Sequence, residues 1–116
     1  MDDLEAIDSL MKKYDIKVSP PGAYCGKGWY NLLEGLIKEL IALGWDRQLA
    51  QVKEKFGGLR FYMDSYDEKF DEPIDRAERK SYTICESCGN DGKLLKPNGY
   101  WLKTLCESCA DKQKNV

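Results

Sequence analysis

The hydrophobic residues follow a helical period in two stretches of the chain, residues 2–14 and 31–44. The apolar positions are Leu4, Ile7, Leu10 and Met11 in the first stretch, and Leu32, Leu33, Leu36, Ile37, Leu40, Ile41 and Leu43 in the second. Spacings of three and four residues place such side chains on one face of a helix. We therefore expect a short amphipathic helix, followed by a central core helix that ends at Gly44.

Between residues 45 and 66 the period changes to two. Apolar residues alternate with polar ones on both sides of Gly57-Gly58: Ala50, Val52 and Phe56 before it, and Leu59, Phe61 and Met63 after it. Two such runs joined by glycines predict a β-hairpin, because glycine reaches the positive φ angles of tight turns. Val52 and Phe61 would face the core helix. The opposite face would carry Lys53, Lys55, Arg60 and Tyr62, as a solvated sheet face or as a binding face.

Loops and shorter elements make up the rest of the chain. The proline-containing residues 18–22 and the acidic residues 64–73 are expected to be surface loops. A helix begins near Asp71-Glu72-Pro73 and leads into the first cysteine pair. Residues 93–105 predict a second hairpin with an Asn-Gly turn, and residues 112–116 a polar, frayed tail.

Four of the five cysteines form two identical tetrapeptides, Cys85-Glu-Ser-Cys88 and Cys106-Glu-Ser-Cys109, with seventeen residues between them. Each Cys-x-x-Cys turn presents two thiolates to one tetrahedral ion. The spacing is typical of a structural zinc site, in which four ligands leave no open position for water. Two disulfides, four free thiols or a bound iron are the alternatives.

The patterns together predict an α+β fold: N-terminal helices packed on an antiparallel hairpin, with a C-terminal zinc ribbon. At 116 residues the chain suits a single domain with one modest core. We expect residues 1–75 to form its helix and hairpin part, and residues 76–116 to form a helix plus the ribbon.

The charge of the chain is small. Residues 1–75 carry a net charge of −5 and residues 76–116 one of +3, which gives the net −2 of the whole chain and argues against wholesale wrapping of nucleic acid. The first residues are acidic where a secretory signal is basic, and no apolar run reaches the length of a membrane span. We therefore expect a cytoplasmic protein, in a compartment where paired cysteines are more often metal or redox sites than structural disulfides.

The residues give little support to catalysis. The chain has no histidine, and the paired cysteines are assigned to the metal. Cys25 is the leftover thiol, either a buried structural cysteine or, less in keeping with the missing histidine, a nucleophile. Gly26-Lys27-Gly28 precedes a helix as phosphate loops do, but it lacks the Walker pattern and fits a turn.

Several stretches together resemble a family of small uncharacterised phage and prophage proteins. They are Cys25–Tyr30, the sequence VKEKFGGLRFY of residues 52–62, Ala77–Ser81, Cys85–Gly89 and Trp101–Cys106. The resemblance covers most of residues 25–110, and residues 52–62 are its most specific part. It implies a viral or prophage origin and the four-cysteine metal site, and it implies no reaction.

A non-catalytic binding module is the function that these observations favour. Near-neutral charge and a surplus of aromatic residues favour a host or phage protein as the partner, and a phage protein of this kind could modulate a host factor or a host defence complex. The alternative partner is nucleic acid, contacted by the Lys53, Lys55, Arg60 and Tyr62 face and by Arg76, Arg79 and Lys80.

Overall fold

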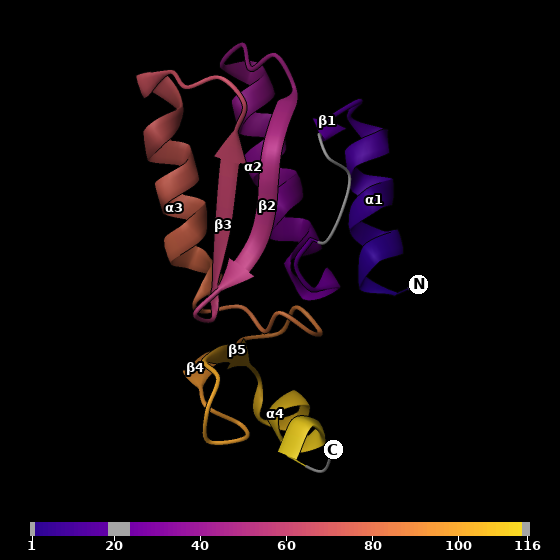
Figure 1. The fold of residues 1–116 in the computed structure, drawn as a ribbon, viewed down its shortest axis with the longest axis vertical. Helices are drawn as coiled ribbons and strands as arrows, with labels where there is room; N and C mark the ends of the chain where they lie inside the picture. The colour runs from indigo at the N-terminus through magenta and orange to yellow at the C-terminus, as the bar shows by residue number, and fades with distance from the viewer. Residues whose placement is uncertain (1, 19–23, 115–116) are drawn as a thin grey trace.

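The computed structural model describes residues 2–18 and 24–114 as an elongated α+β molecule of 43 × 27 × 21 Å. A three-stranded sheet with helices α1, α2 and α3 forms the larger part, and a small unit with β4, β5 and α4 lies at one end of the long axis (Figure 1). The predicted α+β class is thus confirmed. No helix within the described ranges is both long and apolar enough to cross a membrane.

Helix α1 (Asp3–Lys13) begins at Asp2, whose carboxylate accepts the backbone N–H of Glu5 at 2.8 Å. It buries one stripe, consisting of Ala6, Ile7, Leu10 and Met11. Leu4 was expected in that stripe but is 56% exposed, because it lines an open groove beside β2 and is not covered by the core. Most of the predicted loop 18–22 lies outside the described residues.

Helix α2 (Tyr30–Ala42), preceded by the 3-10 turn η1 (Lys27–Trp29), covers one face of the sheet (Figure 1). Its buried side is Leu33, Leu36, Ile37 and Leu40, which confirms the predicted core helix. Gly44 follows its end with a φ of +95°, in the left-handed region that glycine adopts at little cost.

The sheet has the strand order β1-β2-β3, and its hairpin is the predicted one. β2 (Gln48–Lys55) pairs with β3 (Gly58–Met63) in antiparallel register, with Val52 opposite Phe61, and both of these side chains are buried as predicted. β1 (Lys17–Val18) adds a parallel pairing to β2. The connection that a parallel pair needs contains α2. Because β1 has only two residues, it shows no alternation of apolar and polar positions, and the sequence did not predict it.

The turn of this hairpin lies one residue earlier than predicted. Phe56 and Gly57 occupy it, with φ angles of 54° and 83°, so Phe56 is no strand residue and its ring is 64% exposed. A register shift between Leu49 and Gln51 also breaks the expected alternation, because it buries Leu49 and leaves Ala50 half-buried.

Helix α3 (Asp71–Ser81), preceded by the 3-10 turn η2 (Glu68–Phe70), covers the outer edge of β3. Ser81 Oγ accepts the N–H of Leu59 at 2.9 Å, and Glu78 Oε2 accepts the N–H of Phe61 at 3.0 Å. Side chains of a helix therefore satisfy the edge that would otherwise be open to another strand.

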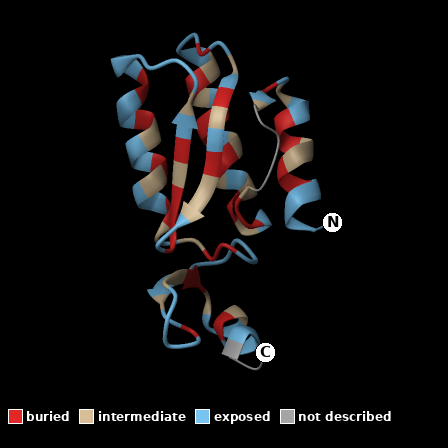
Figure 2. Ribbon diagram, in the orientation of Figure 1, coloured by how far each residue is buried: buried red, intermediate tan, exposed pale blue. Residues whose placement is uncertain are grey.

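The cysteine ribbon, defined here as residues 84–114, contains β4 (Lys93–Leu95), β5 (Lys103–Leu105) and α4 (Glu107–Lys114). β4 pairs with β5 in antiparallel register as predicted, but residues 96–102 form a loop between them, so Asn98-Gly99 is only part of a longer connection and β5 begins at Lys103. Helix α4 includes residues 112–114, which were expected to be frayed. The ribbon is mostly exposed (Figure 2), and its small buried centre consists of Cys85, Leu105 and Ala110.

Candidate metal centre and its junction with the core

The four cysteines of the two tetrapeptides meet in the ribbon. The sulfur atoms all lie within 4.8 Å of one another, and they belong to Cys85, Cys88, Cys106 and Cys109. The sulfurs of Cys88 and Cys106 lie 3.7 Å apart. All five cysteines of the chain are free thiols. The four sulfurs can hold one metal ion.

The two knuckles are built differently despite their identical sequence. The first closes with the N–H of Gly89 donating to the carbonyl of Cys85 at 2.9 Å, and Gly89 has a φ of +86°. The second continues as α4, where the N–H of Ala110 donates to the carbonyl of Cys106 at 2.9 Å. A glycine turn and a helix thus aim the two sulfur pairs at one point.

Two thiols of the cluster, those of Cys85 and Cys109, have different pKa values because their surroundings differ. Burial would raise the pKa of Cys85, but backbone N–H groups of Cys106, Cys88 and Ser87 outweigh it and bring that pKa to about 7. Burial and the neighbouring thiols raise the pKa of Cys109 to about 12. Close thiols lose their protons one after another because each thiolate opposes the next. A bound cation removes that opposition and favours the deprotonated sulfurs.

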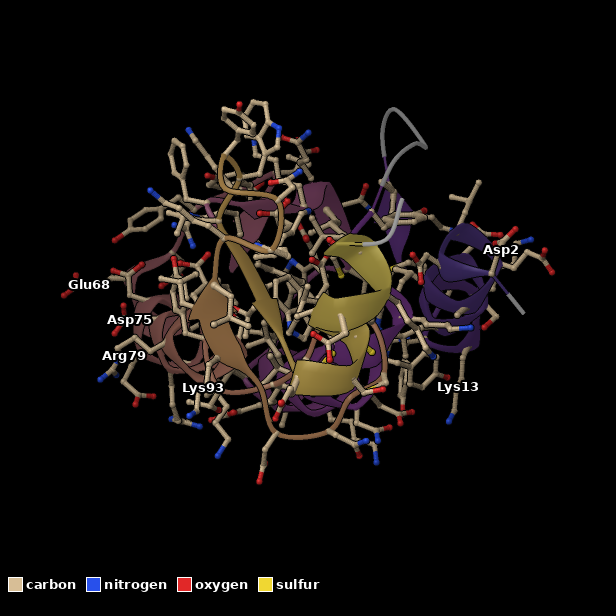
Figure 3. All side chains as sticks on the ribbon, turned by 90° about the horizontal axis from the view of Figure 1, so that it is seen from below. Asp2, Lys13, Glu68, Asp75, Arg79 and Lys93 are labelled. Atoms are coloured by element: carbon tan, nitrogen blue, oxygen red, sulfur yellow. The ribbon has the colours of Figure 1, made fainter. Side chains whose placement is uncertain are left out.

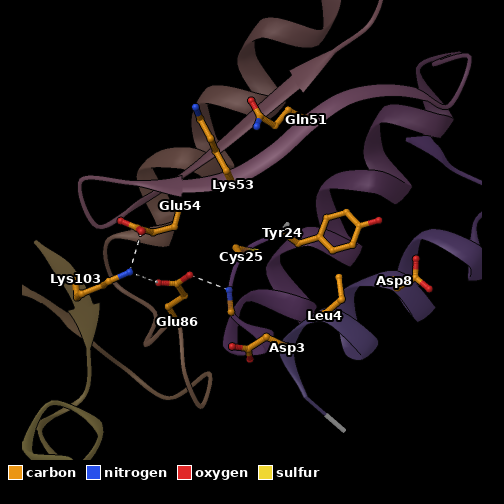
Figure 4. Close-up of a pocket in the computed structure, with 11 residues that line it drawn as sticks. Asp3, Leu4, Asp8, Tyr24, Cys25, Gln51, Lys53, Glu54, Glu86 and Lys103 are labelled. Carbon is orange, nitrogen blue, oxygen red and sulfur yellow. Dashed lines mark hydrogen bonds and ion pairs between the residues drawn. The ribbon is translucent and has the colours of Figure 1, made fainter. Parts of the chain in front are cut away.

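Cys25 lies outside the cluster, as predicted. Its side chain is 4% exposed, and burial raises its pKa to about 12. The residue lies on the wall of a groove of about 1050 Å³ between α1, residues 24–26 and β2 (Figure 4). A buried thiol with this pKa stays protonated at neutral pH, which suits a structural residue.

Gly26-Lys27-Gly28 packs against the first knuckle. The N–H of Gly28 donates to the carbonyl of Glu86 at 2.7 Å, and the N–H of Gly26 donates to Glu86 Oε2 at 2.8 Å. A Cβ on Gly28 would come within 2.5 Å of the Glu86 carbonyl oxygen. The glycines therefore allow two backbones to touch, and this contact explains their presence without a phosphate.

The hairpin β2–β3 makes a second connection between core and ribbon. Lys103 Nζ lies 2.9 Å from Glu54 Oε1 and 3.9 Å from Glu86 Oε1 (Figure 4). Glu54 Oε2 also accepts the N–H of Gly57 at 2.7 Å, and Thr104 Oγ1 donates to the carbonyl of Gly57 at 2.6 Å. The polar groups between groove and ribbon are therefore paired with each other.

Sequence reasoning missed Glu86 and Lys103. Glu86 is 9% exposed, and burial raises its pKa while the N–H of Gly26 and the charge of Lys103 oppose the rise. Glu107 holds the same place in the second tetrapeptide but is exposed. Nothing in the two identical tetrapeptides distinguishes these glutamates, so only the packed structure could reveal the difference.

The predicted face of Lys53, Lys55, Arg60 and Tyr62 is present on one side of the hairpin, since Lys53 lies opposite Arg60 in the register. Lys53 Nζ lies 5.8 Å from the centroid of the Tyr62 ring. Arg60 donates to the hydroxyl of Tyr82 at 3.1 Å and to the carbonyl of Leu59 at 2.8 Å. The guanidinium of Arg60 is thus engaged within the protein.

Neither a protein-family model, nor a curated protein, nor a solved structure matches this chain. Its class follows from the fold and the sulfur cluster. The chain is a small α+β protein whose C-terminal ribbon can bind a metal ion through four cysteines.

Proposed function

We propose that this protein is a non-catalytic, protein-binding module whose ribbon is held by one structural zinc ion. Cys85, Cys88, Cys106 and Cys109 would be the zinc ligands. Four thiolates fill a tetrahedral zinc site, and the free energy of zinc binding in such small units is free energy of folding. The support for zinc is the ligand set and its spacing, which is that of zinc ribbons.

The observation that carries the binding function is a pair of exposed rings at the tip of the ribbon. Tyr100 is 83% exposed and Trp101 is 71% exposed. The side-chain oxygen of Asn98 accepts the backbone N–H groups of both residues, at 3.2 and 3.3 Å, so the loop that presents the rings is itself held in shape. Tryptophan and tyrosine are the residues that most often anchor protein interfaces.

The ion pairs of α3 support a protein rather than a nucleic acid as the partner. Arg76 pairs with Glu72 and Glu39, and Arg79 pairs with Asp75. Figure 3 shows Asp75 and Arg79 together at the periphery of the molecule. Because these arginines already have carboxylate partners, few phosphates could be neutralised there without breaking a pair.

The non-catalytic part of the proposal rests on the buried, protonated thiol of Cys25 and on the lack of histidine in the sequence. The resemblance to phage and prophage proteins leads us to propose the setting: an accessory protein in the host cytosol that modulates or inhibits a host factor or defence complex. Reducing conditions in the cytosol would keep the cysteines available to zinc.

Affinity capture from a bacterial lysate, with and without nuclease, tests the proposed partner class. The bait is the zinc-loaded chain, and the matched control is a Tyr100→Ser, Trp101→Ser variant, which leaves the sulfur ligands in place. We expect one protein complex that is enriched with or without nuclease and is lost with the variant. Enrichment that disappears with nuclease contradicts the proposal.

A further inference from the structure

Phe56 occupies a backbone conformation that does not suit phenylalanine. Its φ is 54° and that of Gly57 is 83°, so both central residues of the β2–β3 turn are left-handed. Asparagine and glycine lead at such positions because they tolerate this conformation, whereas a bulky side chain is strained in it. The turn thus carries a cost that an Asn-Gly turn would avoid.

The ring of Phe56 contributes little to the stability of the fold. It is 64% exposed, and its ring contact is with the ammonium of Lys55, 5.4 Å from the ring centroid. Backbone strain that is not offset by packing is characteristic of functional residues. The left-handed backbone of Phe56 therefore points to a contact between its ring and another molecule.

Another exposed apolar side chain lies beside this turn. A Cβ on Gly57 would meet Leu94 Cδ1, and Leu94 is 44% exposed. Phe56 and Leu94, here called the turn patch, therefore form one apolar area where the hairpin meets the ribbon.

The charges around the turn patch are positive. Lys55 directly precedes Phe56, with its ammonium 5.4 Å from the centroid of that ring, and Lys93 and Lys96 lie on either side of Leu94 and Leu95. Lys93 points outward into solvent in Figure 3. Glu54, the acidic residue next to Lys55 on β2, is already paired with Lys103. The acidic run 64–72 lies at the end of the long axis away from the ribbon (Figure 1).

We propose that the turn patch binds an acidic segment of a partner protein, which places apolar side chains against Phe56 and Leu94 and carboxylates beside the lysines. This inference rests on the proposed protein-binding function and names the chemistry of the partner. Charge complementarity of this kind sets orientation and the rate of encounter, while the apolar contacts supply affinity.

Selection from a library of random dodecapeptides against the zinc-loaded chain tests the inference. We expect the enriched peptides to combine Asp or Glu with aromatic or aliphatic residues. Their dissociation constants, measured by fluorescence anisotropy, should rise about tenfold or more for Phe56→Asn. The melting temperature of Phe56→Asn should meanwhile rise by about 3 °C, because the turn becomes an unstrained Asn-Gly turn. Tyr66→Asn removes another exposed ring, at the far end of the molecule, together with its hydroxyl hydrogen bond to Asp71, and should leave the dissociation constants unchanged.

The outcomes separate the two proposals. If the peptides bind the parent chain and the Phe56→Asn variant equally well, the turn patch is not their binding site, although a protein-binding function remains. A library without enriched peptides overturns the turn patch as a site for an acidic segment, while the affinity capture described above still decides the protein-binding function. An oligothymidylate that competes with the peptides and itself depends on Phe56 assigns the patch to single-stranded nucleic acid instead. Dimers that dissociate on Phe56→Asn in analytical ultracentrifugation assign it to a second copy of this chain.

Discussion

At the scale of single residues, identical sequence leads to different roles in the two tetrapeptides. The carboxylate of Glu86 is buried and accepts the N–H of Gly26, whereas Glu107 is exposed at the start of α4. Replacing each by alanine therefore compares the same chemical change in two environments.

We predict that Glu86→Ala lowers the free energy of unfolding by about 1–3 kcal/mol, because the buried N–H of Gly26 loses its acceptor. Glu107→Ala should change it by about 0.5 kcal/mol or less, as substitutions of exposed residues usually do. Urea denaturation of the zinc-saturated variants measures both. Equal losses for the two variants would show that the carboxylate of Glu86 does not stabilise the junction between the ribbon and the core.

The glycines of the 26–28 segment act at the same scale. We predict that Gly28→Ala destabilises the fold by about 1–3 kcal/mol, since its Cβ would overlap the backbone of Cys85 and Glu86. Gly35→Ala on α2 is the matched control. Its Cβ would meet nothing within 4 Å, and alanine should stabilise the helix by about 0.5–1 kcal/mol. Thermal unfolding distinguishes the two, and a neutral Gly28→Ala would contradict the close contact.

At the scale of elements, periodicity in the sequence revealed the long regular segments and missed the short ones. The stripe of α2 and the alternation around Val52 and Phe61 were visible because each covers several turns or residue pairs. The strand β1 was missed because it has only two residues. Phe56 was predicted as a strand residue because it fits the alternation, but its backbone is left-handed and it lies in the turn. Short pairings and turn positions depend on contacts with other segments, which a local pattern does not contain.

The four cysteines were predictable because metal ligands repeat at fixed spacing, and the hairpin face of Lys53, Lys55, Arg60 and Tyr62 followed from alternation alone. The junction was not predictable, because it joins residues far apart in the sequence. Its contacts link Glu54 to Lys103 and Gly26 to Glu86.

An ion pair between α1 and α2 makes a pH prediction at this scale. Glu34 accepts hydrogen bonds from Lys13 Nζ at 2.8 Å and from the hydroxyl of Tyr14 at 2.7 Å. Both lower the pKa of Glu34 below its ordinary value. The carboxylate therefore stabilises the fold above the unfolded-state pKa of about 4.3, and this contribution is lost as the pH falls through the folded-state pKa.

We predict that Glu34→Gln lowers the melting temperature at neutral pH and that the difference from the parent chain shrinks toward acid. Comparing variant and parent at each pH cancels the loss of metal on acidification, which both share. A difference that stays constant from neutral pH to about pH 3.5 would rule out the ionised form of Glu34 as its cause.

At the scale of the whole molecule, one ribbon is attached to the core at several points. The indole N–H of Trp29 donates to the carbonyl of Ile84 at 2.8 Å, directly before the first ligand, and Thr104 reaches Gly57 of the hairpin. The ribbon itself buries only a small apolar centre. Its order should therefore depend on metal, and loss of the metal should weaken the junction as well.

The metal content of the purified chain tests this account most directly. Inductively coupled plasma mass spectrometry, on protein purified under reducing conditions, should find one zinc per chain for the parent and for Cys25→Ala. It should find less than about 0.2 zinc per chain for Cys88→Ser, with residues 84–110 unfolded in amide-exchange measurements. A Cys88→Ser chain that keeps its metal and its melting temperature, or a parent chain that carries two disulfides and no zinc, would contradict the account.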